Sequence, residues 1–235
     1  SSSNNNTINS NEITSNSRSG VFLLSSSNNN TINSNEITEN TDYGVHLFSS
    51  SSNDVSDNEF VDDGLVISDS DDLTVNDNTV NDKDLLYHED NTTQTIDQEK
   101  GQIILNNCTN YTIKNQEISN TDIAIQLHKT NQTTIKNNNL TKNTLIGVLL
   151  SESSDNNTVS SNEITNNTNF GVDLSSSSNN NTVTSNNITS NYLGVYLSSS
   201  SDNVLYLNNF IDNDEDHVFS DSDNSWVSPE EITYE

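Results

Sequence analysis

The sequence predicts an all-β protein, a right-handed single-stranded parallel β-helix of roughly ten coils, each about 20–24 residues long. Three observations lead to this prediction. The chain repeats itself, each repeat contains three very short alternating segments, and an amide side chain recurs at one fixed place in the repeat. Together they favour a stack of similar coils over a globular domain or a disordered chain.

The repeat is nearly exact at the start of the chain. The segment S-S-N-N-N-T-I-N-S-N-E-I-T begins at Ser2 and again at Ser26, a displacement of 24 residues. Each repeat holds the segments T-[IV]-x, N-x-[IVLF]-x and G-V-x-L. Segments of three or four residues are too short for stable hairpins or sandwiches, but they can become rungs of continuous parallel sheets when coils stack. The crossover preference of parallel strands makes the coil right-handed.

The apolar residues of these segments predict three inward columns that run through the whole stack. Only 29% of the chain is hydrophobic, a fraction that is low for a globular domain and typical of disordered chains. About four apolar residues per coil are nevertheless enough to fill the narrow bore of a β-helix. The first column is Ile8, Ile32, Val55, Val75, Ile113, Ile135, Val159, Val183 and Val204. The second is Ile13, Ile37, Phe60, Val80, Ile118, Leu140, Ile164, Ile188 and Phe210. The third pairs the Val and Leu positions of the G-V-x-L tetrads.

An amide side chain lies two residues before each member of the second column. Asn has a poor strand propensity, so the recurrence predicts a ladder in which each amide hydrogen-bonds to the coils above and below it. The ladder positions are Asn11, Asn35, Asn58, Asn78, Gln116, Asn138, Asn162, Asn186 and Asn208. The glycines that open the tetrads are expected at corners with an unusual backbone conformation.

Residues 1–235 are interpreted as one β-helix domain. The spacing is looser at about 61–116, where 83–87, 95–97 and 101–104 are expected to be strands of diverged coils. The segment 220–235 is expected to lead out of the solenoid. Because the chain starts within a repeat and has neither a signal peptide nor an anchor, it is expected to be a fragment of a longer surface protein.

The charge limits the possible partners. Seven Lys or Arg against 35 Asp or Glu give a net charge of −28, which argues against nucleic acid and anionic membrane surfaces. No apolar run is long enough to insert into a membrane. Cys108 is the only cysteine and is expected to be a small packed residue.

The pattern S-S-x-N-N-T-I-x-x-N-x-I-x-x-N-x-x-G-V-x-L resembles the repeats of NosD-like proteins, the so-called periplasmic copper-binding type. The segments 101–115 and 224–234 are similar to versions in surface proteins of methanogenic archaea. The resemblance implies a β-helix with an extracellular, cell-surface location. It also implies copper, which the residues do not favour: the chain has one Cys, no Met and four separated His, and His46 and His217 lie at opposite ends of the predicted rod.

No convincing catalytic constellation is found, so the chain is not predicted to be an enzyme. Enzymes on this fold combine carboxylates with a cation, and most of the cations here lie in the middle of the chain. A catalytic site would be expected there, although a solvated irregular coil is the favoured interpretation. The candidate residues are Asp82, Asp84, His88, Glu89, Asp90, Asp97, Glu117 and His128.

No cofactor is predicted beyond weak calcium binding by acidic runs that match no known calcium loop. The candidate calcium ligands are Asp69, Asp71, Asp72, Asp212, Asp214 and Asp216.

The x residue of each tetrad is expected to point outward and form a stripe along one side of the rod. Such a stripe can contact sugar rings, a neighbouring rod or a covering segment, or it can simply follow strand propensity. The stripe residues are Phe22, His46, Val66, Gln126, Leu149, Asp173, Tyr196 and Val218.

Two functions are therefore considered. The first is a non-enzymatic extracellular scaffold of a surface layer, sheath, filament or adhesin, whose partners are neighbouring copies or other cell-surface components. The alternative is a carbohydrate-binding or polysaccharide-processing β-helix of the lyase, epimerase or hydrolase type, whose partner is a glycan.

Overall fold

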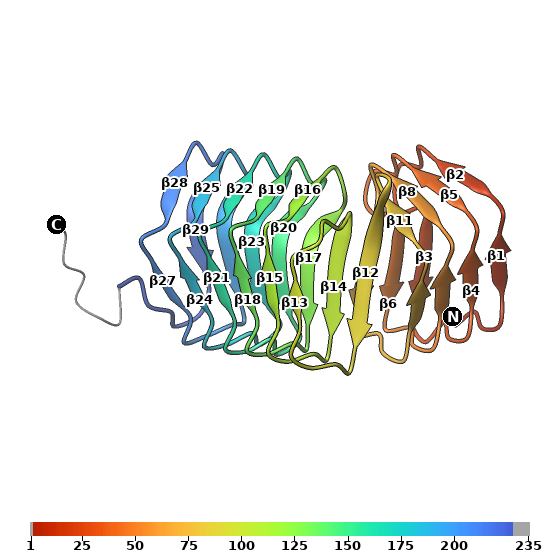
Figure 1. The fold of residues 1–235 in the computed structure, drawn as a ribbon, viewed down its shortest axis with the longest axis horizontal. Helices are drawn as coiled ribbons and strands as arrows, with labels where there is room; N and C mark the ends of the chain where they lie inside the picture. The colour runs from red at the N-terminus through yellow and green to blue at the C-terminus, as the bar shows by residue number, and fades with distance from the viewer. Residues whose placement is uncertain (1, 228–235) are drawn as a thin grey trace.

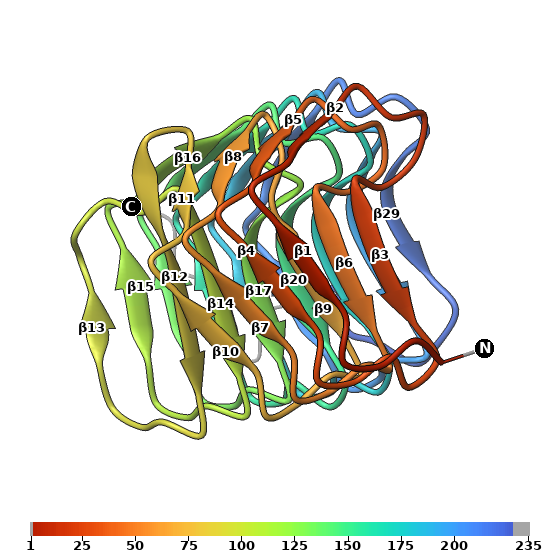
Figure 2. The same ribbon diagram turned by 90° about the vertical axis from the view of Figure 1, so that its right-hand side faces the viewer.

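The computed structural model describes residues 2–227 and has the predicted fold, a right-handed parallel β-solenoid of about nine coils (Figure 1). Ser1 and residues 228–235 lie outside the described part. Within that part no helix is long and apolar enough to cross a membrane. The strands form two stacks of coils, here named the N-terminal stack (residues 2–80) and the C-terminal stack (residues 83–227), and Figure 2 shows the coils lying behind one another.

The N-terminal stack has three sheets of short parallel strands. The first contains β1 (Thr7–Asn9), β4 (Thr31–Asn33), β7 (Asp54–Ser56) and β10 (Thr74–Asn76). The second contains β2 (Glu12–Thr14), β5 (Glu36–Thr38), β8 (Glu59–Val61) and β11 (Thr79–Val80). The third contains β3 (Val21–Leu24), β6 (Val45–Phe48) and β9 (Leu65–Ser68).

The C-terminal stack repeats this plan. Its first sheet contains β13 (Thr95–Ile96), β15 (Thr112–Lys114), β18 (Thr134–Lys136), β21 (Thr158–Ser160), β24 (Thr182–Thr184) and β27 (Val204–Tyr206). Its second contains β16 (Glu117–Ser119), β19 (Asn139–Thr141), β22 (Glu163–Thr165), β25 (Asn187–Thr189) and β28 (Asn209–Ile211). Its third contains β12 (Lys83–Glu89), β14 (Gln102–Asn106), β17 (Ile123–His128), β20 (Ile146–Ser151), β23 (Phe170–Ser175), β26 (Leu193–Ser198) and β29 (Asp216–Ser220).

The predicted columns are present within each stack, where Ile8 pairs with Ile32 and Ile164 with Ile188. They do not run through the whole rod as predicted, because the buried apolar residues form two main clusters. One lies in the C-terminal stack, and the other lies in the N-terminal stack and extends across the junction to Leu85 and Ile104. One column member is also wrong. Val183 pairs with Leu205, which is 4% exposed, so Leu205 and not Val204 faces the bore.

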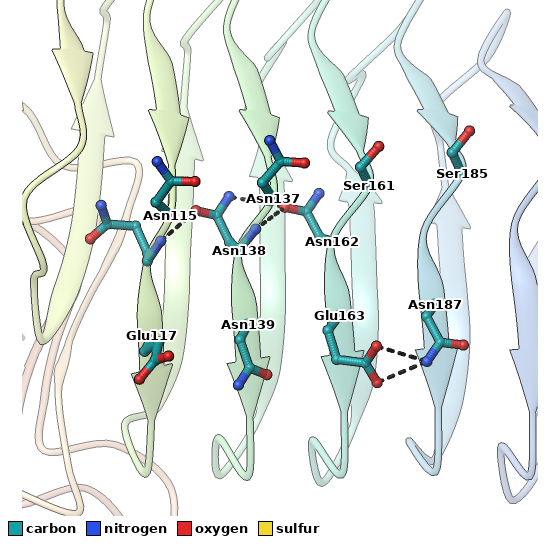
Figure 3. Close-up of a pocket in the computed structure, with 11 residues that line it drawn as sticks. Asn115, Glu117, Asn137, Asn138, Asn139, Ser161, Asn162, Glu163, Ser185 and Asn187 are labelled. Carbon is teal, nitrogen blue, oxygen red and sulfur yellow. Dashed lines mark hydrogen bonds between the residues drawn. The ribbon is translucent and has the colours of Figure 1, made fainter.

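The amide ladder is confirmed within each stack. The backbone N–H and the side-chain Nδ2 of Asn138 both donate to Oδ1 of Asn162 (Figure 3). Asn162 makes the same pair of bonds to Asn186. The ladder is interrupted between Asn78 and Gln116, where the stacks meet. Three further ladders, which the sequence analysis missed, occupy other corners of the coil; they pass through Asn181, Asn191 and Ser178.

The tetrad glycines have a different role from the one predicted. None of the seven glycines has a positive φ, and the left-handed corner positions are taken by residues such as Ser34 and Asn137, both with φ 55°. Glycine is needed for close packing instead. A Cβ on Gly147 would lie 2.6 Å from Cγ2 of Ile164 and 2.7 Å from the carbonyl oxygen of Gly171.

The expected strands of the irregular region exist as β12, β13 and β14, and β12 marks the change of stack. It turns back antiparallel on β11, with Val80 opposite Lys83, and then runs parallel to β14 (Figure 1). At the other end, the coil continues past the predicted exit at residue 220. Ser225 bridges Val204, and Asn224 Oδ1 accepts from the N–H of Asn203. The predicted exit segment from 228 onward lies outside the described residues.

At the junction of the two stacks, here named the seam, β11 and β12 join through their backbones, but β9 meets the C-terminal stack through side chains instead of a backbone ladder. The N–H of Leu65 in β9 donates to Oε1 of Gln102, and Nε2 of Gln102 donates to the carbonyl of Leu65. Gln126 pairs with the N–H and carbonyl of Ile67 in the same way. A buried edge strand needs partners for these groups, and two glutamine amides supply them.

Candidate functional site

The candidate site is the outer face of the third sheets, where they pass the seam. Phe22 and His46, from neighbouring strands β3 and β6, stack with ring centroids 5.0 Å apart and an interplanar angle of 12°. The ring centroid of Tyr43 lies 4.4 Å from that of His46, and the Phe48 ring meets the His46 ring edge-on with the centroids 6.0 Å apart. Burial lowers the pKa of His46 to about 4, so its ring is neutral at physiological pH. These four rings are named the N-terminal aromatic cluster.

A second aromatic cluster lies on the C-terminal stack. Tyr196 is sandwiched between Phe170, at 4.6 Å and 11°, and Phe219, at 5.2 Å and 15°. Its members come from β23, β26 and β29, which are consecutive rungs of one sheet. Rungs of a parallel sheet lie about 4.8 Å apart, which suits offset stacking of aromatic rings. These three rings are named the C-terminal aromatic cluster.

Between the two clusters lies a groove of about 360 Å³, here named the seam groove. Its apolar lining comes from both stacks and includes Val66, Ile123 and Leu149, while Phe48 and Phe170 belong to the adjoining clusters. Three carboxylic acids also line it, and none of its described lining residues is Lys, Arg or His. The acidic residues are Asp69, Glu152 and Asp173.

The groove carboxyls are perturbed by burial and by one another. Asp173 is 7% exposed, and burial raises its pKa to about 7. A hydrogen bond from Ser175 lowers the pKa but does not offset the effect of burial. Its Oδ1 has no hydrogen-bond partner. Burial, followed by the charge of Asp69, raises the pKa of Glu152. Two of the three groove carboxyls, Glu152 and Asp173, therefore hold a proton more tightly than a free carboxylic acid does.

The predicted stripe is only partly on this face. Phe22, Leu149 and Tyr196 lie there, and His46, Val66 and Asp173 are buried at its floor. Gln126 is fully buried in the seam instead of pointing outward. Val218 is also misplaced: it pairs with Val195 on the inward side, and Phe219 occupies the outward position beside Tyr196.

Tyr43 and Phe170 were missed by the sequence analysis. Both immediately precede a tetrad glycine, and the aromatic residue at this place in two coils was the available signal.

The middle region that was considered for catalysis does not assemble into one site. Asp84 and Asp97 form ion pairs with Lys100 and Lys114 at 2.8 and 3.0 Å. His88 Nδ1 lies 2.9 Å from the hydroxyl of Tyr111. The other candidates are also dispersed. Asp82, Asp90 and Glu117 are exposed, Glu89 accepts from the N–H groups of Asp72 and Leu73, and burial lowers the pKa of His128 to about 4.

The predicted calcium ligands are also dispersed. Asp71 is engaged by Lys129 at 2.7 Å, Asp69 lines the seam groove, and Asp72 is exposed. Asp212, Asp214 and Asp216 are exposed on the turn between β28 and β29 and within β29. In residues 2–227 no group of three or more His, Cys, Asp or Glu is placed to hold a metal ion. Calcium binding by these residues stays a prediction.

A second, larger hollow of about 600 Å³ follows the amide ladder of the C-terminal stack (Figure 3). Its amides bond mainly to the neighbouring coil; for example, Nδ2 of Asn187 donates to both carboxylate oxygens of Glu163 at 2.8 Å. It has neither the aromatic rings nor the unpartnered carboxyl of the seam groove.

The fold defines this chain as a right-handed parallel β-helix protein, and a family model described as "Right handed beta helix region" matches residues 1–98. A second model, "Periplasmic copper-binding protein (NosD)", matches residues 61–235, which is most of the chain. The chain therefore belongs to the NosD family. No curated protein matches it.

Solved structures share the fold at low identity. Two mutant structures of the periplasmic alginate epimerase AlgG align with TM-scores of 0.54 and 0.50, both at 16% identity over 86% and 80% of this chain. The A-module of the mannuronan C-5 epimerase AlgE4 of Azotobacter vinelandii aligns with a TM-score of 0.44 at 16% identity, over 86% of this chain and 64% of that one. This chain spans 58% and 57% of the two AlgG chains.

The expectation that the chain is not an enzyme is contradicted by this comparison, because these structural neighbours are carbohydrate-processing enzymes. The physical reason for the error is that the expectation relied on clusters visible along the chain. A solenoid brings together side chains from different coils, as it does for Asp69 and Glu152. At these identities the likeness extends to the fold alone.

The described residues do not fit a copper site. His46 lies among aromatic rings, His88 contacts Tyr111, and the Cys108 thiol is buried, where it contacts the carbonyl oxygens of His88 and Asn106. Burial raises the pKa of Cys108, which opposes the thiolate form that binds metals. No copper chemistry is therefore derived for this chain.

Proposed function

We propose that this chain is a polysaccharide-binding and polysaccharide-processing β-helix that works outside the cytoplasm and holds a glycan along the outer face of its third sheets. The observation that carries the proposal is the arrangement of two aromatic clusters on either side of the seam groove on one face of the rod. Aromatic rings offer flat apolar surfaces for sugar rings, and the groove adds the few polar groups that orient a ligand. The family description supports a location outside the cytoplasm, and the AlgG epimerase that shares the fold supports a polysaccharide as the ligand.

The exposed edges of the clusters suit a long ligand. Phe22 is 47% exposed, and Phe48 and Phe219 are each 40% exposed. Exposed apolar strips on a polar protein are typical of contact surfaces. A polymer lying parallel to the rod axis would cross several rungs and engage both clusters together, which a single sugar could not do.

The test is binding of the full chain to a glycan array, followed by calorimetry with the glycans retained. Tyr196→Ser and Phe22→Ser are expected to weaken binding about tenfold each, corresponding to about 1.4 kcal/mol. Tyr206→Ser is the matched control, because Tyr206 is a ring on the first sheet, away from this face. Retention of no glycan, or an equal loss in the control, would refute the binding proposal.

Processing is tested separately by incubating retained glycans with the chain and analysing them for shortened or epimerised products. Products that disappear in Asp173→Asn would support processing at the seam groove. Products that persist unchanged in that variant would place the chemistry elsewhere, and unchanged glycans would refute processing by this chain.

A further inference from the structure

We infer that the seam groove is a subsite for a sugar residue that carries a protonated amine, so that the glycan bound by this chain is a polymer containing amino sugars. The inference rests on the proposed function and adds the chemical class of the ligand. It is carried by three carboxyl groups that converge on one aromatic-walled groove from strands far apart in the sequence.

The carboxyls come from both sides of the seam. Asp69 follows β9 of the N-terminal stack, Glu152 follows β20, and Asp173 lies in β23 of the C-terminal stack. The raised pKa of Glu152 reflects burial and the nearby charge of Asp69. The charge of Lys129 opposes this shift only in part, so a cationic ligand beside the two carboxyl groups gains further free energy.

Asp173 supplies an independent sign of a missing partner. Its side chain is almost entirely buried, yet Oδ1 has no hydrogen-bond partner. An unmade hydrogen bond of a buried polar atom costs about 1–3 kcal/mol. An ammonium group has three N–H donors and no acceptor, so it can satisfy this oxygen and bond to further carboxylate oxygens.

The nearby cations of the protein are already engaged. Lys129 Nζ lies 2.7 Å from a carboxylate oxygen of Asp71, and Arg18 Nε lies 3.3 Å from Asp42 at the edge of the N-terminal aromatic cluster. None of the groove's described lining residues is basic. A ligand can therefore supply the positive charge that the lining itself does not carry.

A metal ion fits the groove less well than an amine. Calcium needs several oxygens converging at about 2.3–2.6 Å, and within residues 2–227 no three acidic, His or Cys side chains are grouped in that way. Hydrogen bonds from an ammonium to carboxylates are longer, about 2.7–2.9 Å, and tolerate wider separation of the acceptors. The aromatic walls also attract a cation that lies over a ring face.

A polyuronate fits less well for the opposite reason. The chain has a net charge of −28, and a uronate polymer would bring one more carboxylate per sugar residue to an acidic groove. A glucosamine polymer carries the complementary charge, and its sugar rings can still stack on the flanking aromatic clusters.

The test compares three hexasaccharides of matched length by calorimetry at slightly acidic pH: glucosamine, N-acetylglucosamine and mannuronate. We expect the glucosamine hexamer to bind at least tenfold more tightly than the N-acetylated hexamer, and the mannuronate hexamer most weakly. The Asp69→Asn/Glu152→Gln double variant should reduce the preference for glucosamine to less than threefold and leave affinity for the N-acetylated hexamer unchanged.

Two controls separate the possible results. Glu59→Gln removes an exposed carboxylate from β8, on another sheet, and should keep the full preference. Equal binding of the charged and neutral hexamers would overturn the amino-sugar inference while the proposed glycan binding stands, whereas retention of no glycan on the array would remove both. If calcium alone raises the melting temperature of the wild type but not of the double variant, and the glucosamine hexamer does not bind, the groove is a metal site and the inference is wrong.

Discussion

The sharpest prediction concerns a buried carboxyl in the seam. Oδ2 of Asp122 accepts hydrogen bonds from the N–H groups of Gly44 at 2.9 Å and Gly64 at 3.0 Å, and thereby links the C-terminal stack to two coils of the N-terminal stack. Its other oxygen accepts from the hydroxyl of Thr144 at 3.0 Å. Burial raises the pKa of Asp122 to about 8, and the charge of Asp63 contributes to the shift.

The sign of the pH effect follows from proton binding. The pKa of Asp122 is about 8 in the folded chain, against an ordinary value of 3.8, so between these two pH values the folded state holds a proton that the unfolded state has lost. Its contribution to stability is therefore present below about pH 4, falls as the pH rises and is fully lost above about pH 8. About four pH units at 1.36 kcal/mol each give an upper figure of about 5–6 kcal/mol.

Asp122→Asn keeps an oxygen that can accept from both glycines and removes the charge. We expect the free energy of unfolding of the variant to exceed that of wild type increasingly as the pH rises, by about 1–2 kcal/mol at pH 5 and by a few kcal/mol at pH 9. Urea unfolding at pH 5, 7 and 9 in high salt measures the difference, with Glu59→Gln as the control for net charge. A difference that stays constant across this pH range would refute the assignment of a titrating Asp122.

Three further substitutions test the fold. Asn162→Ala removes a buried ladder amide and should lower the free energy of unfolding in urea by about 3 kcal/mol. Asn139→Ala removes an exposed amide from β19 and should lower it by less than about 0.5 kcal/mol. Gly147→Ala should lower stability by about 1–3 kcal/mol because its Cβ would overlap the next coil, and unchanged melting would contradict the packing role. Gln126→Leu should speed hydrogen exchange at the Ile67 amide, whose partner is the Gln126 side chain, and unaltered protection there would contradict the side-chain closure of the seam.

The repeat allowed the coils, rungs and amide ladder to be predicted because each coil packs mainly on the next, so sequence spacing determines which residues meet. The same reasoning erred by one residue where two apolar residues are adjacent, as in Val204-Leu205 and Val218-Phe219, since either neighbour could face the bore. Glycine was assigned a backbone role because positive φ is its usual reason, but Asn, Asp and Ser fill those corners here.

The seam and its groove could not be predicted from the repeat, for a physical reason. Coils in perfect register place like residues over like, so even the hollow along the amide ladder repeats similar polar groups from one rung to the next. A groove that combines Asp69 with Glu152 needs coils more than 80 residues apart to meet, and that contact is determined by individual side chains such as Gln102 and Gln126 that replace a missing rung. The position where the regular pattern stops is thus also where dissimilar side chains can converge on a ligand. For this reason the irregular region of such a chain is the first place to look for chemistry, even when no residue there forms a motif.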